Sequence, residues 1–185
     1  MKDDDDDDLR TTEVDDDPRN GDRWEAAQEG AELLRDHEID AAVAELERVV
    51  KAQPDNEYAL FFLGAAHFEA KRYDRAMKAY LAAVAVKPGY LGALAGVGHS
   101  LRMVGKHDES LRVAKQILLK SKDDADGLHL AGLAHFARGE AAAAAQYLER
   151  FLTTKPEAEV GQEVAGLLEV IRGQFEALDP DADLN

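Results

Sequence analysis

Six histidines are the side chains of this sequence best suited to chemistry, because a neutral imidazole can ligate a metal ion or transfer a proton near neutral pH. They are His37, His67, His99, His107, His129 and His135. A metal site on a helix would need a spacing such as His-x-x-x-His or Glu-x-x-His, and neither occurs. No Ser/His/Asp set, phosphate-binding loop or carboxylate pair stands out, and there is no cysteine. We therefore predict no enzyme activity, no cofactor and no metal site.

Carboxylates are numerous but unevenly distributed along the 185 residues. The chain carries a formal net charge of −16, and residues 1–22 alone contain ten Asp and one Glu against three basic residues, a net charge of −8. This balance argues against binding to nucleic acid or to an anionic membrane surface. With few apolar residues, residues 1–22 are expected to form a disordered acidic tail. The tail could solubilise the protein, attract a basic partner or compete for a binding groove.

The sequence lacks the usual signals for export or membrane insertion. No apolar run approaches the roughly 18 residues that a membrane span needs. The start, MKDDDDDDLR, is the opposite of the basic and then apolar start of a secretory signal. We expect a soluble, cytoplasmic protein without direct membrane insertion, and the alanine-rich composition suggests a bacterial source.

Glycine recurs at a fixed step of 34 residues along most of the chain. The glycines are Gly30, Gly64, Gly98, Gly132 and Gly166, and the prolines Pro54, Pro88 and Pro156 share the period. Lys122 stands where the remaining proline would fall. A period of this length is typical of a helical repeat array.

The repeat defines the predicted domain organisation. Four units, 23–56, 57–90, 91–124 and 125–158, each contain two stretches with the i, i+3, i+4, i+7 apolar spacing of an amphipathic helix. A single further helix over 159–178 has one apolar stripe and no partner helix after it, which is typical of a terminal cap. An acidic tail, 179–185, ends the chain. The prediction is an all-α, right-handed superhelical solenoid of four helix hairpins and a C-terminal capping helix.

Two small residues in each unit carry a resemblance to a known family. The eighth place of each unit is glycine, and the twentieth place is Ala42, Ala76, Ser110 and Ala144 in turn. The twenty-fourth place is large in three units, as Leu46, Tyr80 and Leu148, but is Ala114 in the third. This pattern over residues 23–177 resembles the tetratricopeptide repeat (TPR) family. A larger side chain at the eighth or twentieth place would overpack the crossing of the two helices in a hairpin.

The resemblance implies that the first helix of each unit lines a concave groove. The candidate partner-binding residues at its exposed places are Trp24, Leu34, Tyr58, Phe61, Phe62, Phe68, His99, Arg102, His129, Leu130, Leu133 and Phe136. His99 and His129 fall on the groove side of neighbouring units, where a two-histidine metal site is conceivable but has no supporting spacing. Alternatively, the three phenylalanines of the second unit, Phe61, Phe62 and Phe68, pack between units and bind nothing.

The resemblance also limits the ligand. Well-known family members bind acidic C-terminal peptides of heat-shock chaperones through a Lys/Asn/Arg clamp. The matching places here are Ala27, Ala31, Phe62, Gly92 and Gly96, so the clamp is absent. An apolar groove suits an amphipathic helix or an extended apolar peptide instead.

Three functions remain open at this point. The first is an adaptor or scaffold that holds an apolar segment of a partner protein in the groove. The second is a secretion or assembly chaperone that shields an apolar client segment, because the bacterial type III translocator chaperones are similar small acidic repeat proteins. The third is a structural protein that self-associates through its ends. Nucleic acid is not an expected partner of any of them.

Overall fold

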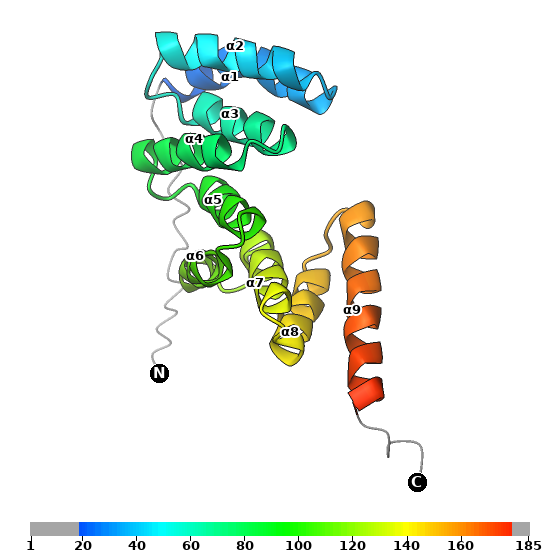
Figure 1. Ribbon diagram of the computed structural model, residues 1–185. Helices are drawn as coiled ribbons and strands as arrows, with labels where there is room; N and C mark the ends of the chain where they lie inside the picture. Colours follow the sequence, from blue (N-terminus) through cyan, green and yellow to red (C-terminus); the bar gives the residue numbers. More distant parts are fainter. Residues whose placement is uncertain (1–18, 179–185) are drawn as a thin grey trace, which may run out of the picture.

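The computed structural model describes residues 19–178, with side chains through residue 173, and these residues form nine helices and no strand (Figure 1). The helices are α1 (Asn20–Arg35), α2 (Ile39–Ala52), α3 (Glu57–Glu69), α4 (Tyr73–Val86), α5 (Leu91–Met103), α6 (His107–Lys120), α7 (Ala125–Ala137), α8 (Ala141–Thr153) and α9 (Ala158–Leu178). The first eight pair as consecutive hairpins that stack on one another, and α9 follows them. The predicted all-α superhelical solenoid is confirmed.

The first helix begins earlier than predicted. The predicted domain starts at Arg23, but α1 begins at Asn20, where the hydroxyl of Tyr58 donates a hydrogen bond of 2.5 Å to Oδ1 of Asn20. This bond fixes the start of α1 against the start of α3, so residues 20–22 belong to the fold and not to the acidic tail. The rest of the predicted tail, 1–18, and the C-terminal segment 179–185 lie outside the described residues.

The turn inside each hairpin depends on one residue in the left-handed backbone region. These residues are His37, Lys71, Gly105 and Gly139, with φ between 58° and 80°, and they recur at the 34-residue period. The turn closes by a backbone hydrogen bond that reaches back into the first helix, as from Arg72 N–H to the carbonyl oxygen of His67 at 2.8 Å. Glycine adopts this conformation without strain. In the first two units a residue with a side chain, His37 or Lys71, adopts it instead.

The turn between units keeps its shape even where the periodic proline is missing. Pro54 and Pro88 each occupy the second position of a turn. Lys122 takes the corresponding position, where Asp124 N–H donates to the carbonyl oxygen of Ser121 at 3.1 Å. The hydrogen bond therefore closes this turn without the fixed φ of proline.

Asn56 joins the first two units and begins α3. Its side-chain oxygen accepts hydrogen bonds from the backbone N–H of Tyr58 (3.1 Å) and Ala59 (3.0 Å), which are free at a helix start. Its amide donates to the carbonyl oxygen of Arg23 at 2.8 Å, and the Arg23 guanidinium lies 3.2 Å from the buried carboxylate of Glu57. Asn56 is completely buried, so the cap also fixes the position of one unit against the next.

The periodic glycines allow a large side chain from the facing helix to approach the backbone. The opposing side chains are Leu46 for Gly30, Tyr80 for Gly64 and Leu148 for Gly132. A Cβ atom added at these glycines would lie only 2.4 to 2.6 Å from the nearest side-chain atom. The twenty-fourth residue of each of these units thus fills the space that the eighth residue leaves.

The third unit reaches the same spacing by a different contact. Because its twenty-fourth residue is Ala114, the space beside Gly98 is filled by Leu130 of α7, whose Cδ2 would lie 2.1 Å from an added Cβ. Leu130 is therefore completely buried, and the prediction that it lines the groove is wrong. The fifth glycine, Gly166, is exposed with no atom within 4 Å of an added Cβ. Its role as a repeat-defining contact is also wrong, because no helix packs against it.

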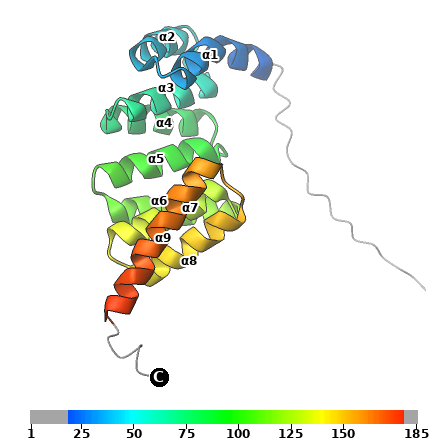
Figure 2. The same cartoon turned by 90° about the vertical axis from the view of Figure 1, so that its right-hand side faces the viewer.

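The final helix packs against α8 and crosses in front of the last hairpins (Figure 2). Val164, Leu168 and Ile171 of α9 form one buried cluster with Leu148 and Phe151 of α8. The helix thus covers apolar surface of the last hairpin, as a cap does.

We expect Gly64→Ala to destabilise the fold by about 1–3 kcal/mol, because the new methyl group would overlap the ring of Tyr80. The matched control is Gly166→Ala, where the site is open and the better helix former should stabilise by about 0.5–1 kcal/mol. Urea unfolding of both variants measures the difference. Equal effects at the two glycines would contradict the packing role of Gly64.

Candidate functional site

A pocket of about 480 Å³ lies on the side of the solenoid that faces α9, and we call it the concave pocket. It is lined by Phe68, His99, Arg102, Ala125, Asp126, His129, Leu133, Phe151, Pro156, Glu157 and Val160. These residues come from α3, α5, α7 and α8, from the turn after α8 and from the start of α9, so the pocket forms only once the last three hairpins and α9 are assembled. Its volume is in the range of pockets that bind small molecules or protein side chains.

The turn after α8 brings the start of α9 to the pocket. Lys155 adopts the left-handed conformation, with φ of 58°, and Pro156 follows it. The hydroxyl of Thr154 donates a hydrogen bond of 2.7 Å to the carbonyl oxygen of Phe151, which ends α8. The chain then reverses, and Val160 in the first turn of α9 becomes part of the pocket wall.

A pair of histidines forms the centre of the pocket. The ring centroids of His99 and His129 lie 5.8 Å apart, and His129 stacks on Phe151 at 4.6 Å. Burial, with the neighbouring His129 and Arg102 adding smaller effects, lowers the pKa of His99 to about 3. Burial and Arg102 lower the pKa of His129 to about 4. Both imidazoles are therefore neutral at pH 7 and present one donor and one acceptor each.

Two charged groups flank the histidines. Burial lowers the pKa of the Arg102 guanidinium, and its Nε is buried without a hydrogen-bond partner. Asp126 keeps an exposed side chain, and partial desolvation by the surrounding residues, with a smaller contribution from Asp124, raises its pKa. A buried donor without a partner is costly, so a ligand that offers an acceptor to Arg102 would gain that hydrogen bond. Among residues 19–173, no group of three or more His, Asp or Glu side chains is arranged to hold a metal ion.

A second set of aromatic residues lies in the N-terminal half. The ring of Trp24 meets Tyr58 at 5.4 Å and Phe62 at 5.9 Å, and Phe61 meets Tyr90 at 5.1 Å. Trp24 is 46% exposed, whereas the others are partly buried and pack against the core. The residues of this aromatic cluster therefore pack between units and also leave part of their surface exposed.

The structure divides the predicted groove residues into separate groups. Five line the concave pocket, namely Phe68, His99, Arg102, His129 and Leu133. Four form the aromatic cluster, namely Trp24, Tyr58, Phe61 and Phe62. Leu34 and Phe136 pack, partly buried, against the hydrophobic core, and Leu130 lies inside it.

Sequence reasoning missed several contributors to these surfaces, and three of them are aromatic or apolar side chains. Phe151 lies on the second helix of its unit, and Val160 follows the last complete unit, so the repeat pattern assigned neither to the groove. Tyr90, in the turn before α5, packs on Phe61. The apolar stripe of α9, which includes Val160, was the one available signal.

Residues 28–90 and 98–159, more than half of the chain, match the tetratricopeptide repeat family. The chain belongs to the TPR family. Members of this family are typically protein-interaction scaffolds without enzyme activity, and a protein-binding role follows at that general level. No helix among residues 19–178 is long and apolar enough to cross a bilayer.

Among sequences, a TPR protein of Saccharomyces cerevisiae, small glutamine-rich tetratricopeptide repeat-containing protein 2, is 26% identical over 97 residues. The match covers 52% of this chain and only 28% of that protein. This chain therefore spans less than a third of the relative's length.

Among solved structures, the thermophilic TPR protein TTC0263 of Thermus thermophilus superposes with a TM-score of 0.70 at 22% identity, covering 85% of this chain and 84% of that one. MamA of Desulfovibrio magneticus gives 0.63 at 17% identity, covering 88% and 98%. The second TPR domain of human RPAP3, in complex with an HSP70 peptide, gives 0.58 at 16% identity, covering 62% and 97%. At these identities the likeness shows the fold alone.

The neutral histidines predict a pH dependence of stability. Because both pKa values are lowered from 6.5, the unfolded chain binds more protons than the folded one at pH values below about 6.5. The free energy of unfolding should therefore fall as the pH drops from 7 towards 4.5. His129→Phe keeps a ring on Phe151 and removes one titrating group, so its melting temperature should decline less over this range.

The control is His37→Asn, at an exposed turn position whose left-handed backbone asparagine accepts. Its melting temperature should follow the same pH curve as the parent chain. A parent-like pH slope in the His129 variant would show that this histidine is not held neutral by burial.

Proposed function

We propose that this TPR chain is an adaptor or scaffold whose concave pocket anchors an apolar segment of a partner protein. The observation that carries the proposal is the pocket itself. Its walls are largely apolar, with Phe68, Leu133 and Val160 among the lining residues, and it offers a few polar groups at fixed places. Sites that bind a side chain firmly combine such walls with a small number of orienting hydrogen bonds.

The polar groups favour a particular kind of segment. Neutral His99 and His129 can donate and accept hydrogen bonds without the cost of desolvating a charge. An apolar side chain in the pocket, with backbone N–H and C=O groups of an extended peptide or helix end at its rim, would use both histidines. The aromatic cluster supplies a second, partly exposed apolar surface in the N-terminal half, and a few aromatic contacts often dominate binding energy.

Two alternatives within protein binding make different predictions. A secretion or assembly chaperone would hold one aggregation-prone client at a fixed stoichiometry and keep it soluble. A self-associating structural protein would show a molar mass that rises with concentration in light scattering. An adaptor would bind a folded partner through one segment and stay monomeric without it.

The test is capture of partners from the source cell with two matched variants. Leu133→Asp places a charge in the concave pocket, and we expect about tenfold or greater loss of capture, as for a binding hot spot. Leu119→Asp places the same charge at a side chain that is 87% exposed on α6 and lies outside the pocket. That variant should capture the partner as the parent chain does.

Circular dichroism melting accompanies both variants, because Leu133 is partly buried. Should Leu133→Asp melt early, Val160→Asp at the opposite wall provides an independent charge in the pocket. If the folded pocket variants capture the partner as well as the parent chain does, the proposal is wrong.

A further inference from the structure

Arginine is almost always paired in this acidic protein. Among the described residues, only Arg75 and Arg102 of the arginines have no carboxylate within 4.0 Å. Carboxylates outnumber basic residues by 38 to 22 in the whole chain, so partners are plentiful. Within residues 19–173, the two arginines without a carboxylate partner lie on successive hairpins, Arg75 on α4 and Arg102 on α5.

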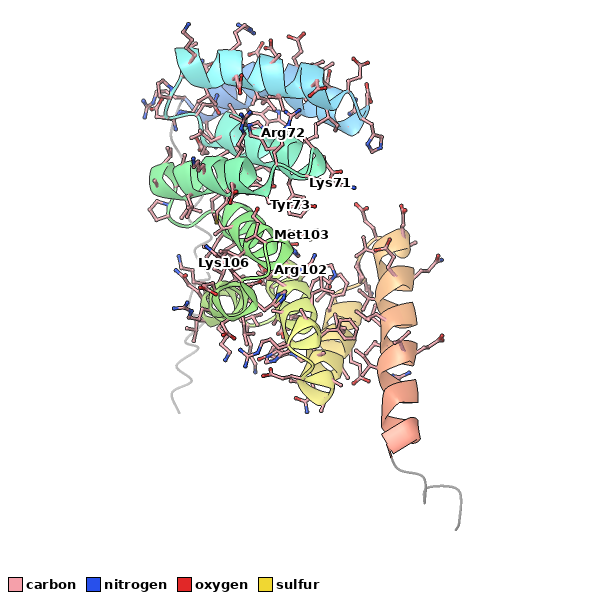
Figure 3. All side chains as sticks on the ribbon, in the orientation of Figure 1. Lys71, Arg72, Tyr73, Arg102, Met103 and Lys106 are labelled. Atoms are coloured by element: carbon pink, nitrogen blue, oxygen red, sulfur yellow. The ribbon has the colours of Figure 1, made fainter. Side chains whose placement is uncertain are left out.

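Arg75 lines the same small pocket as Lys71, and Arg102 lies four residues before Lys106, at the turns that join α3 to α4 and α5 to α6. Figure 3 shows Lys71, Arg72, Tyr73, Arg102, Met103 and Lys106 gathered there. Lys71 and Lys106 are exposed and have no carboxylate within 4.0 Å among the described residues. A pocket of about 330 Å³ is lined by Lys71, Arg72, Tyr73, Asp74, Arg75 and Val104. We call Lys71, Arg75, Arg102 and Lys106, together with Arg72, the hairpin-end surface.

Several carboxylates near this surface are already paired with arginines. Asp40 pairs with Arg72 at 2.9 Å, Asp108 pairs with Arg138 on the next hairpin, and Glu109 lies 3.8 Å from Arg112. Asp74 lines the small pocket but lies beyond ion-pair distance of both lysines. Four positive charges thus remain without a direct counter-charge from residues 19–173.

We propose that the hairpin-end surface docks the acidic N-terminal segment of the same chain. Residues 1–18 contain nine Asp and one Glu against Lys2 and Arg10, and six of the Asp form the unbroken run 3–8. The segment therefore carries half of the chain's net charge of −16 in 18 residues, and its sign is the opposite of that of the surface. Closely spaced carboxylates suit a surface that presents several separate cations.

The chain is long enough for this contact. Asn20, where α1 begins, is hydrogen-bonded to Tyr58 at the start of α3, and Lys71 follows the end of that 13-residue helix. A helix of this length spans about 20 Å. Asp8 lies 12 residues before Asn20, and a flexible chain of 12 residues has a root-mean-square reach of about 19 Å. The Asp run can therefore reach Lys71 without full extension.

Attachment to the same chain makes weak ion pairs sufficient. A linked segment meets its site at an effective concentration in the millimolar range, which a separate acidic peptide in the cell would rarely reach. Exposed ion pairs are individually weak and sensitive to salt, so the docked state should be partial and reversible. Arg102 also lines the concave pocket, which places the docked segment at the edge of the proposed partner site. The docking itself does not depend on that proposed function.

The test is carbodiimide cross-linking of the full chain, which joins a carboxylate directly to a lysine that it contacts. We expect peptides of residues 3–8 to be linked to Lys71 and Lys106 about fivefold more than to Lys115 and Lys122, a preference that two exposed ion pairs can support. Lys115 and Lys122 are also exposed but lie on α6 and the turn after it. High salt should remove the preference.

Two double variants and an isotope mixture complete the experiment. Arg75→Gln with Arg102→Gln should lower the links at Lys71 and Lys106 to the level of the control lysines. Arg112→Gln with Arg172→Gln, which alters arginines elsewhere, should leave those links unchanged. Arg75→Gln alone replaces the first pair if that pair melts early.

An equal mixture of unlabelled and ¹⁵N-labelled chains shows whether linked peptides come from one molecule. Links within single chains support the proposal. Mixed links between labelled and unlabelled peptides, in the proportion that random pairing of separate chains gives, would assign the surface to the tail of a second copy and overturn it. An even distribution over all exposed lysines would overturn it as well.

Discussion

The close approach of a large side chain to a glycine on the facing helix sets the geometry of this protein. At Gly64 an added methyl group would lie 2.6 Å from the ring of Tyr80, so the two helices could not stay at their present distance. The same contact recurs in three of the four hairpins, and Leu130 provides it for the third. Because each hairpin is held at this spacing, α3, α5 and α7 can stack side by side. The concave pocket is a consequence of that stacking.

The periodic pattern was sufficient to predict the helices, since glycine, small residue and turn recur at a fixed step. It was not sufficient to predict which groove positions are open. Leu130 occupies a place that is exposed in related repeats, yet here it is buried because Ala114 leaves a space that another side chain must fill. The identity of one residue in a unit thus changed the exposure of a residue in the next unit. Such compensation involves residues far apart in the sequence and is not visible in any single unit.

The repeat pattern could not predict the concave pocket itself. Phe151 and Val160 reach it only because the chain reverses at Lys155 and Pro156, and no periodic signal specifies the direction of α9 after that turn. His99 and His129 were placed on neighbouring helices by the repeat register. Their ring separation of 5.8 Å and their lowered pKa values depend on how deeply the assembled hairpins bury them.

Most of the charge in the described part of this molecule lies outside the apolar pocket. Most carboxylates are on exposed helix faces, where several pair with arginines. The concave pocket combines neutral imidazoles and apolar walls with three charged residues, Arg102, Asp126 and Glu157. A high net charge favours solubility, so this arrangement is compatible with the apolar surface that we propose binds a partner. The hairpin-end surface adjoins the concave pocket at Arg102, which belongs to both.

The most direct test of the central claim is hydrogen–deuterium exchange of the full chain, alone and with a captured partner. If the concave pocket is the binding site, exchange should slow on binding at the end of α5, along α7 and at the start of α9. Exchange in α4 and α6, which contribute no residue to the pocket, should be unchanged. Slower exchange confined to α4 and α6, with none in α7 or α9, would contradict the account.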